Sequence, residues 1–317
     1  MITHRPRHTA AWAARARRAL IGVLLCHALG STVGCSLEPA DRDGTEATQA
    51  AASARGIRFG AGANAPEWDL TQGPGLTTVA VHEPYEDREV RFEAVPAVAL
   101  FDLLLGDAWR RADELVFECA DGYRAAVPTA RFLEHQAYLA VARVGGDFAI
   151  DKPVGGAVTR VALAPAYLIW ENQRDSVVRS EGDWGWPYQI VGVTVAMASE
   201  RYARMAPPPD AGADAQRGFG VFRRYCSRCH AINGEGGTLG PELNYPASVT
   251  EYVEPTWLRR WIDAPLTVRH GTPMPGLPPG IPDREAALRD VIAYLTVMAG
   301  HKLAPAEPPA PPVPGAH

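Results

Sequence analysis

The chain has 317 residues, a length that favours about two domains of roughly 150 residues each. Hydrophobic residues make up 47 % and charged residues 21 %, which are the proportions of a soluble globular protein. The formal net charge of −5 gives no indication of nucleic-acid binding.

Residues 1–35 predict an export signal. Basic residues precede an apolar run, residues 19–34, which is too short to span a bilayer comfortably. The run ends in a small residue followed by Cys35, and this resembles a bacterial lipoprotein signal, although Thr32 stands where a leucine is usual. The resemblance implies that Cys35 is lipidated and that the protein is a membrane-anchored lipoprotein of the periplasm. Ordinary signal cleavage and retention as an N-terminal anchor are alternatives, and all three export the protein.

Residues 36–59 lack periodicity and are rich in small and polar residues, so they predict a flexible tether. Residues 60–205 predict a mainly-β α+β domain. Its strands are expected over residues 89–94, 115–119, 123–127, 137–144, 158–164 and 188–196, and a helix over residues 95–105.

The acidity of the chain belongs to this first domain. Residues 60–205 hold 21 acidic and 13 basic side chains, a net of −8. Residues 211–304 hold 9 acidic and 10 basic side chains, a net of +1. A basic partner would therefore be attracted to the first domain.

A Pro-rich linker, residues 206–212, precedes an all-α domain over residues 213–302. Helices are predicted over residues 213–225, 256–263 and 284–299. The Pro/Ala-rich tail, residues 303–317, is expected to be disordered.

Cys226-Ser-Arg-Cys229-His230 is the haem c attachment pattern. Thiols at i and i+3 of a helical turn face one side, where each can add to a haem vinyl group, and His230 then stands over the iron. A zinc site would need two more ligands at similar spacing, and a redox dithiol would need a thioredoxin-like context; neither is present in the sequence. The pattern predicts one covalent haem. Cys119, alone in an apolar stretch, is expected to be a buried thiol.

The segment from about residue 213 to 299 resembles the class I cytochromes c, because five motifs occur in the order of that family. They are Gly-x-x-x-Phe before the first Cys, Gly-Pro after His230, a Trp-rich helix ending before a Pro, a Pro-flanked Met, and an aromatic residue in the last helix. The resemblance assigns roles around the haem to Gly218, Phe222, Pro241, Trp261, Met274 and Tyr294.

The resemblance implies that the Pro241 carbonyl accepts a hydrogen bond from Nδ1 of the axial histidine and that Gly218 allows a second helix to approach. It also implies that Met274 is the sixth iron ligand. Prolines on both sides of Met274 favour a rigid loop that presents the sulfur. His270 is an alternative ligand.

Residues 85–196 carry a weaker resemblance to the later half of the molybdopterin-binding domain of sulfite-oxidase type. The segment that would supply the metal-ligating cysteine should precede Val95, but no cysteine lies between Cys35 and Cys119. We therefore expect the first domain to be free of cofactor.

Together these patterns predict a periplasmic carrier of single electrons, with His/Met-ligated haem c and an N-terminal domain for docking a redox protein. The alternatives are an oxidoreductase with molybdenum or haem at its active site, and the cytochrome subunit of a respiratory dehydrogenase complex. No catalytic residue is predicted.

Overall fold

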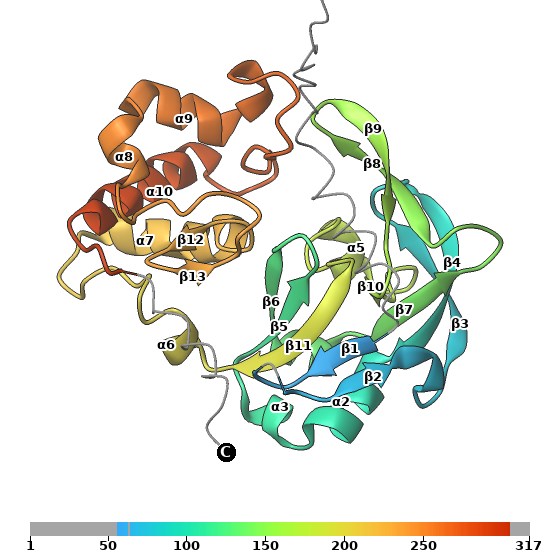
Figure 1. Ribbon diagram of the computed structural model, residues 1–317. Helices are drawn as coiled ribbons and strands as arrows, with labels where there is room; N and C mark the ends of the chain where they lie inside the picture. The colour runs from blue at the N-terminus through green and yellow to red at the C-terminus, as the bar shows by residue number, and fades with distance from the viewer. Residues whose placement is uncertain (1–55, 63, 305–317) are drawn as a thin grey trace, which may run out of the picture. The chain divides into compact units, whose positions relative to one another are not determined.

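The computed structural model describes residues 56–62 and 64–304, and all of these residues belong to one compact unit (Figure 1). Residues 1–35 with Cys35, most of the expected tether, and residues 305–317 lie outside the described residues. The last part of the expected tether differs from the prediction, because Gly56–Phe59 forms strand β1. Strand β1 pairs with two other strands, and its alternate residues Ile57 and Phe59 are buried. Four residues are too few for this alternation to predict a strand from the sequence.

The first domain, residues 56–196, is rich in strands, as predicted. Its strands are β1 (Gly56–Phe59), β2 (Glu67–Asp69), β3 (Thr77–Glu83), β4 (Arg88–Pro96), β5 (Glu114–Cys119), β6 (Arg124–Pro128), β7 (Ala137–Arg143), β8 (Ala149–Val154), β9 (Ala157–Ala162), β10 (Tyr167–Trp170) and β11 (Ile190–Ala196). Its helices are η1 (Leu70–Gln72), α2 (Ala97–Leu105), α3 (Ala108–Arg111), α4 (Thr129–Glu134) and α5 (Ser176–Ser180).

Two larger sheets and one hairpin make up this domain (Figure 1). One sheet has the order β2-β1-β11-β5-β6 and the other the order β10-β7-β4-β3, while β8 and β9 pair only with each other. All pairs are antiparallel apart from β1 with β11. The chain therefore returns to its first strand only at the end of the domain.

A single hydrophobic core joins the two larger sheets. Strands β5 and β10 are almost wholly buried, and β4 alternates with Val90, Phe92 and Ala94 inward. Aromatic rings fill the centre: Phe132 lies 4.9 Å from the Trp170 ring, between centroids. Burial of this much apolar surface is the main stabilising contribution of the domain.

The second domain is helical, as predicted. Its elements are α7 (Ala213–Val221), the π-helical turn η2 (Phe222–Cys226), β12 (Ala231–Ile232), β13 (Glu235–Gly236), α8 (Val249–Tyr252), α9 (Pro255–Asp263), η3 (Pro265–Thr267) and α10 (Arg284–Ala299). Helix α9 begins with the Glu254 carboxylate accepting from the backbone of Thr256 and Trp257.

Helices α7 and α10 cross in contact at Gly218. A β-carbon at this position would lie 1.9 Å from the Asp290 carbonyl oxygen and 2.9 Å from the Tyr294 Cβ. Phe222 and Tyr294 pack beside the crossing, with ring centroids 5.2 Å apart. The two helices can approach this closely only because residue 218 has no side chain.

The boundary between the domains lies earlier than residue 205. Tyr202 and Met205, which follow helix α6 (Ala198–Arg201), are buried in the core of the second domain. The Tyr294 hydroxyl donates to the Met205 carbonyl at 2.6 Å. Residues 202–205 therefore belong with the second domain, and the described residues at the other end extend to Ala304.

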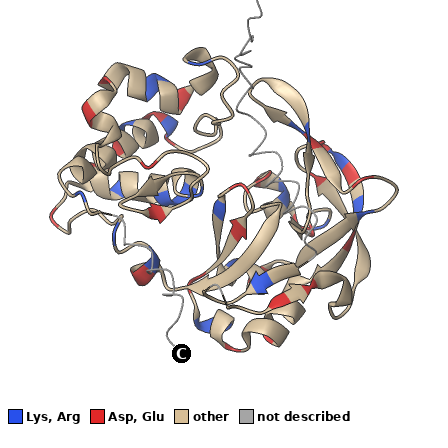
Figure 2. Ribbon diagram, viewed as in Figure 1, with Lys and Arg blue, Asp and Glu red and all other residues tan. Residues whose placement is uncertain are grey.

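The charges of the first domain are mixed in sign. In the view of Figure 2, acidic and basic residues are interspersed over its strands and helices. Among residues 56–62 and 64–304, no helix is long and apolar enough to cross a membrane.

Candidate haem-binding site

The five-residue haem motif lies on a tight turn at the end of η2. The N–H groups of Cys229 and His230 both donate to the Cys226 carbonyl, at 3.0 and 2.9 Å. Both thiols are free and half-buried. The turn thus presents two thiols and an imidazole from positions i, i+3 and i+4.

The His230 imidazole is oriented by the loop that follows it. Its Nδ1 donates to the Pro241 carbonyl at 2.8 Å, which leaves Nε2 as the free nitrogen. The ring lies on Gly240, where a β-carbon would be 2.4 Å from Cε1. Burial lowers the pKa of His230, and the bond to Pro241 opposes that shift. A neutral imidazole with a fixed tautomer is the form that binds a metal.

The loop that carries Pro241 is held by Glu242, a residue that the sequence patterns did not single out. The Glu242 carboxylate accepts from the backbone N–H groups of Asn233, Gly234 and Asn244, each at 2.9 Å. The N–H of Tyr245 also donates to this carboxylate, at 3.2 Å. These four hydrogen bonds to one carboxylate hold the loop, although it has no regular secondary structure. A carboxylate next to a Gly-Pro pair is too common a feature to have indicated this role.

Two further glycines pack the motif from the other side. A β-carbon at Gly236 would lie 2.2 Å from the His230 carbonyl oxygen, and one at Gly237 would lie 2.1 Å from the Arg228 carbonyl oxygen. The Gly236-Gly237 pair at the end of β13 is a signal in the sequence that could have been used to find this contact.

Met274 lies in an irregular loop beside Trp261 of α9. The Trp261 Nε1 donates to the Met274 sulfur at 3.1 Å, and the Met274 N–H donates to Thr272 Oγ1 at 3.3 Å. The loop is tied back to α9 by the N–H of Leu277, which donates to the Ile262 carbonyl at 2.9 Å. A thioether sulfur has a second lone pair, so the bond to Trp261 leaves Met274 able to act as a ligand. His270, the alternative ligand, is exposed.

The two thiols are protonated before attachment. Burial raises the pKa of Cys226 to about 12 and that of Cys229 to about 11. At Cys229 the Arg228 guanidinium and the Lys152 ammonium of the first domain oppose this rise, while Asp121 adds to it. Thioether formation removes the proton, so these values describe the chain before the haem is attached. Cys119 is buried, as expected, and burial raises its pKa.

The residues present fit a covalently attached haem. An imidazole with a free Nε2 and a thioether sulfur are the iron ligands of many c-type haems, and two free thiols at i and i+3 are the groups that bond covalently to the haem. Residues 213–295 match the family model described as "Cytochrome C oxidase, cbb3-type, subunit III".

Residues 213–295 are a cytochrome c domain.

The match implies haem c and a role in electron transfer for the second domain, hereafter the cytochrome domain. It covers the segment that the sequence likened to class I cytochromes c, so the prediction of a cytochrome c domain is confirmed for this part of the chain. No curated protein matches the chain. The resemblance of the first domain to a molybdopterin-binding domain stays a prediction.

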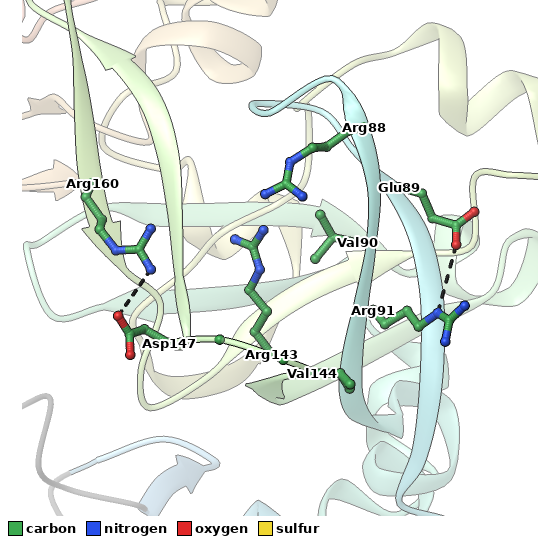
Figure 3. Close-up of a pocket in the computed structure, with 10 residues that line it drawn as sticks. Arg88, Glu89, Val90, Arg91, Arg143, Val144, Asp147 and Arg160 are labelled. Carbon is green, nitrogen blue, oxygen red and sulfur yellow. Dashed lines mark hydrogen bonds and ion pairs between the residues drawn. The ribbon is translucent and has the colours of Figure 1, made fainter.

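A pocket of about 520 Å³ on the first domain is lined by four arginines, Arg88, Arg91, Arg143 and Arg160 (Figure 3). Each guanidinium has a carboxylate partner. Arg143 and Arg88 share Glu86, Arg160 contacts Asp147 and Asp151, and Arg91 lies 4.0 Å from Glu89. The charges of the pocket are therefore balanced within the first domain, and it offers no free cation to an anion.

Among residues 56–62 and 64–304, no group of three or more His, Cys, Asp or Glu side chains is placed to hold a metal ion.

Proposed function

We propose that this protein is a single-haem electron carrier that exchanges one electron at a time with redox partners. The observation that carries the proposal is the bond from His230 Nδ1 to the Pro241 carbonyl, because it leaves Nε2 as the only ligating nitrogen of the ring. Haem c, when bound through Cys226 and Cys229, supplies the one-electron chemistry.

We propose Met274 for the second axial position, and its hydrogen bonds with Trp261 and Thr272 support this choice. A Met/His pair raises the reduction potential relative to two nitrogen ligands. Two protein ligands also leave no coordination position for a substrate, so this ligand set favours electron transfer over chemistry at the iron.

The test is a comparison of Met274→Ala with Met197→Ala, since Met197 is 40 % exposed and lies outside the cytochrome domain. Met274→Ala is expected to abolish the weak sulfur-to-iron charge-transfer band and to lower the potential, while Met197→Ala keeps both. If the band survives in Met274→Ala, another residue is the ligand.

We also propose that each chain carries one haem, because the sequence contains one Cys-x-x-Cys-His pattern. Acid-acetone extraction should leave the haem on the protein, and a haem assay should give one per chain. Release of the haem, or two haems per chain, would contradict this proposal.

The first domain is proposed as a docking module for a basic redox protein. Its net charge of −8 supports this, as do exposed carboxylates such as Glu93, Asp107 and Glu134, for which the described residues provide no ion pair. Electrostatic steering raises association rates by about tenfold or more and fades as salt rises.

Neutralising these three carboxylates as Gln, Asn and Gln should slow reduction by the native donor at low salt and have no effect at high salt. The matched control neutralises Asp210 and Asp283, which are exposed carboxylates of the linker and the cytochrome domain. Equal rates for both variants at low salt would remove the docking role.

Export and anchoring are proposed from the signal pattern, which lies outside the described residues. Cys35→Ala should release the protein from membranes into the soluble periplasmic fraction. A variant that stays bound to membranes would favour an uncleaved anchor instead.

A second candidate is a subunit of a larger respiratory complex, and the family match favours it, because the matched model describes a subunit of an oxidase. Affinity capture from native membranes, with redox spectra of the eluate, separates a bound oxidase or dehydrogenase from a free carrier. Molybdenum in the same eluate, in amounts equal to the chain, would instead favour the oxidoreductase alternative and overturn the proposal that the first domain is free of cofactor.

A further inference from the structure

The first domain contacts the haem motif through its backbone. The N–H of Arg124 donates to the Arg228 carbonyl at 2.9 Å, and the N–H of Thr238 donates to the Gly122 carbonyl at 2.9 Å. These two bonds join the turn between β5 and β6 to the two segments that flank His230. Backbone pairing of this kind fixes the turn on the motif regardless of side-chain identity.

Side chains reinforce the same contact. Arg228, the residue between the two haem cysteines, donates to the Tyr123 hydroxyl at 3.0 Å. Arg124 reaches the Gly236 carbonyl at 3.4 Å. Gly122 has φ +87°, and a β-carbon there would lie 2.4 Å from Thr238 Oγ1. The turn therefore sits directly on the loop that leads to Pro241.

A second turn of the first domain contacts the methionine side of the site. Gly155, at the tip of the β8–β9 hairpin, has φ +60°, and a β-carbon there would lie 2.8 Å from the Gly271 carbonyl oxygen. Gly271 is three residues before Met274. Gly156, the next residue of the tip, lies against Leu266 of η3.

We propose that the first domain is a cap over the haem pocket, held by the β5–β6 turn on the histidine side and by the β8–β9 hairpin on the methionine side, and that a protein partner reaches the haem edge when this cap moves away. Haem attached at Cys226 and Cys229 would be bonded to the segment that the β5–β6 turn contacts.

The nature of the contact suits a cap that opens. The two contacts consist of a few hydrogen bonds and glycine backbone approaches, with no ion pair between the turns and the loops among the described residues. Polar contacts between domains of one chain are typical of domains that move relative to one another. Tyr202 and Met205 are packed in the cytochrome core, so the connection between the two domains is held at its cytochrome end. The cap would move about this connection.

The proposal rests on the proposed function, since it requires haem at the motif. It also adds a condition to docking, because a partner attracted by the acidic domain gains access to the haem edge only after the cap is displaced. The apparent reaction rate is then the rate of the open form multiplied by the fraction of molecules that are open.

The test uses the full chain with two matched pairs of glycine variants. Gly122→Ala and Gly155→Ala place a β-carbon against the Thr238 and Gly271 segments. Their controls are Gly145→Ala and Gly106→Ala, whose φ values of +80° and +56° impose similar backbone strain but whose β-carbons would meet nothing within 4 Å. Tyr123→Phe, which removes only the hydroxyl that Arg228 contacts, covers the case in which a glycine variant fails to fold.

The spectrum and potential of each variant are measured first, because they report the proposed ligation independently of the cap. The rate of oxidation by a small basic c-type cytochrome is then measured. Gly122→Ala and Gly155→Ala should react about fivefold faster or more, Tyr123→Phe should change in the same direction by less, and both controls should match the unmodified chain.

Equal rates for all variants, slower cap variants, or equal acceleration in the controls would each overturn the cap. A wild-type spectrum without His/Met ligation would instead overturn the proposed function.

Discussion

At the scale of single residues, the contact between Trp261 and Met274 decides how firmly the sulfur is held. The indole N–H donates to the sulfur at 3.1 Å, and its loss as Trp261→Phe should weaken the held loop by about 1 kcal/mol. We expect the haem to stay attached and the sulfur-to-iron band to disappear at a temperature several degrees lower, as followed by visible absorption during heating.

The matched control is Trp257→Phe, on the same helix α9 but 50 % exposed. Its band should disappear at the temperature found for the unmodified protein. If the band of Trp261→Phe disappears at the temperature found for the unmodified protein, the indole does not position Met274.

Glu86 is a second residue whose effect can be measured, through the pH dependence of stability. Bonds from Arg143 lower the pKa of the Glu86 carboxyl to about 2, and its side chain is only 4 % exposed. Between its ordinary value of 4.5 and about 2, the unfolded chain takes up a proton that the folded chain does not, so stability falls as pH falls through this window. At neutral pH the contribution is about 3 kcal/mol.

Glu86→Gln should therefore lower the free energy of unfolding at pH 7 and flatten its dependence on pH below 4.5, as measured by chemical denaturation. Glu89→Gln, which removes an exposed carboxylate 4.0 Å from Arg91, should leave both unchanged. A profile of Glu86→Gln parallel to that of the unmodified chain would assign the acid sensitivity to other groups.

At the scale of elements, the crossing of α7 and α10 depends on Gly218. An added β-carbon would overlap the Asp290 carbonyl oxygen, so Gly218→Ala must push the helices apart. Overpacking of this kind costs about 1–3 kcal/mol, and we expect a melting temperature lower by several degrees in calorimetry.

Gly220 provides the control within the same helix, because a β-carbon there would meet nothing within 4 Å. Gly220→Ala should stabilise the protein by up to about 1 kcal/mol, since alanine favours a helix over glycine. Equal effects of the two substitutions would mean that helix propensity, rather than the crossing, sets the outcome.

At the scale of the whole molecule, Glu114 joins the two domains. It lies on β5, accepts from the Tyr202 hydroxyl at 2.8 Å and pairs with Arg201 at 3.7 Å and Arg223 at 3.4 Å. Arg201 is 9 % exposed in its side chain and has two nitrogens without a hydrogen-bond partner. Glu114→Gln leaves this buried charge uncompensated, which should cost about 3 kcal/mol and separate the unfolding of the two domains in calorimetry.

The control is Asp147→Asn, which removes an exposed pair with Arg160 inside the first domain and should cost no more than about 1 kcal/mol. One unchanged unfolding transition in Glu114→Gln would show that the domains are joined by other contacts.

The sequence by itself determined the cytochrome domain, because its chemistry depends on short spacings. The distance from Cys226 to His230 along one helical turn, and the hydrophobic period of residues 284–299, follow from local geometry alone. Among the strands of the first domain, β4, which alternates, and β5, which is almost wholly buried, were predicted, whereas β1, β3 and β10 were not. Strands β1 and β10 have only four residues each, which is too short to show a period.

Only the tertiary structure decided which distant residues meet. The packing of Met205 into the cytochrome core, the bond between Arg228 and Tyr123 and the approach of Gly155 to Gly271 join positions about 90 to 120 residues apart. No periodicity or spacing encodes such pairs, because each depends on how segments far apart in the chain pack together. The haem motif of Cys226, Cys229 and His230 could therefore be predicted from the sequence. The contacts between the first domain and that motif are determined only by the fold.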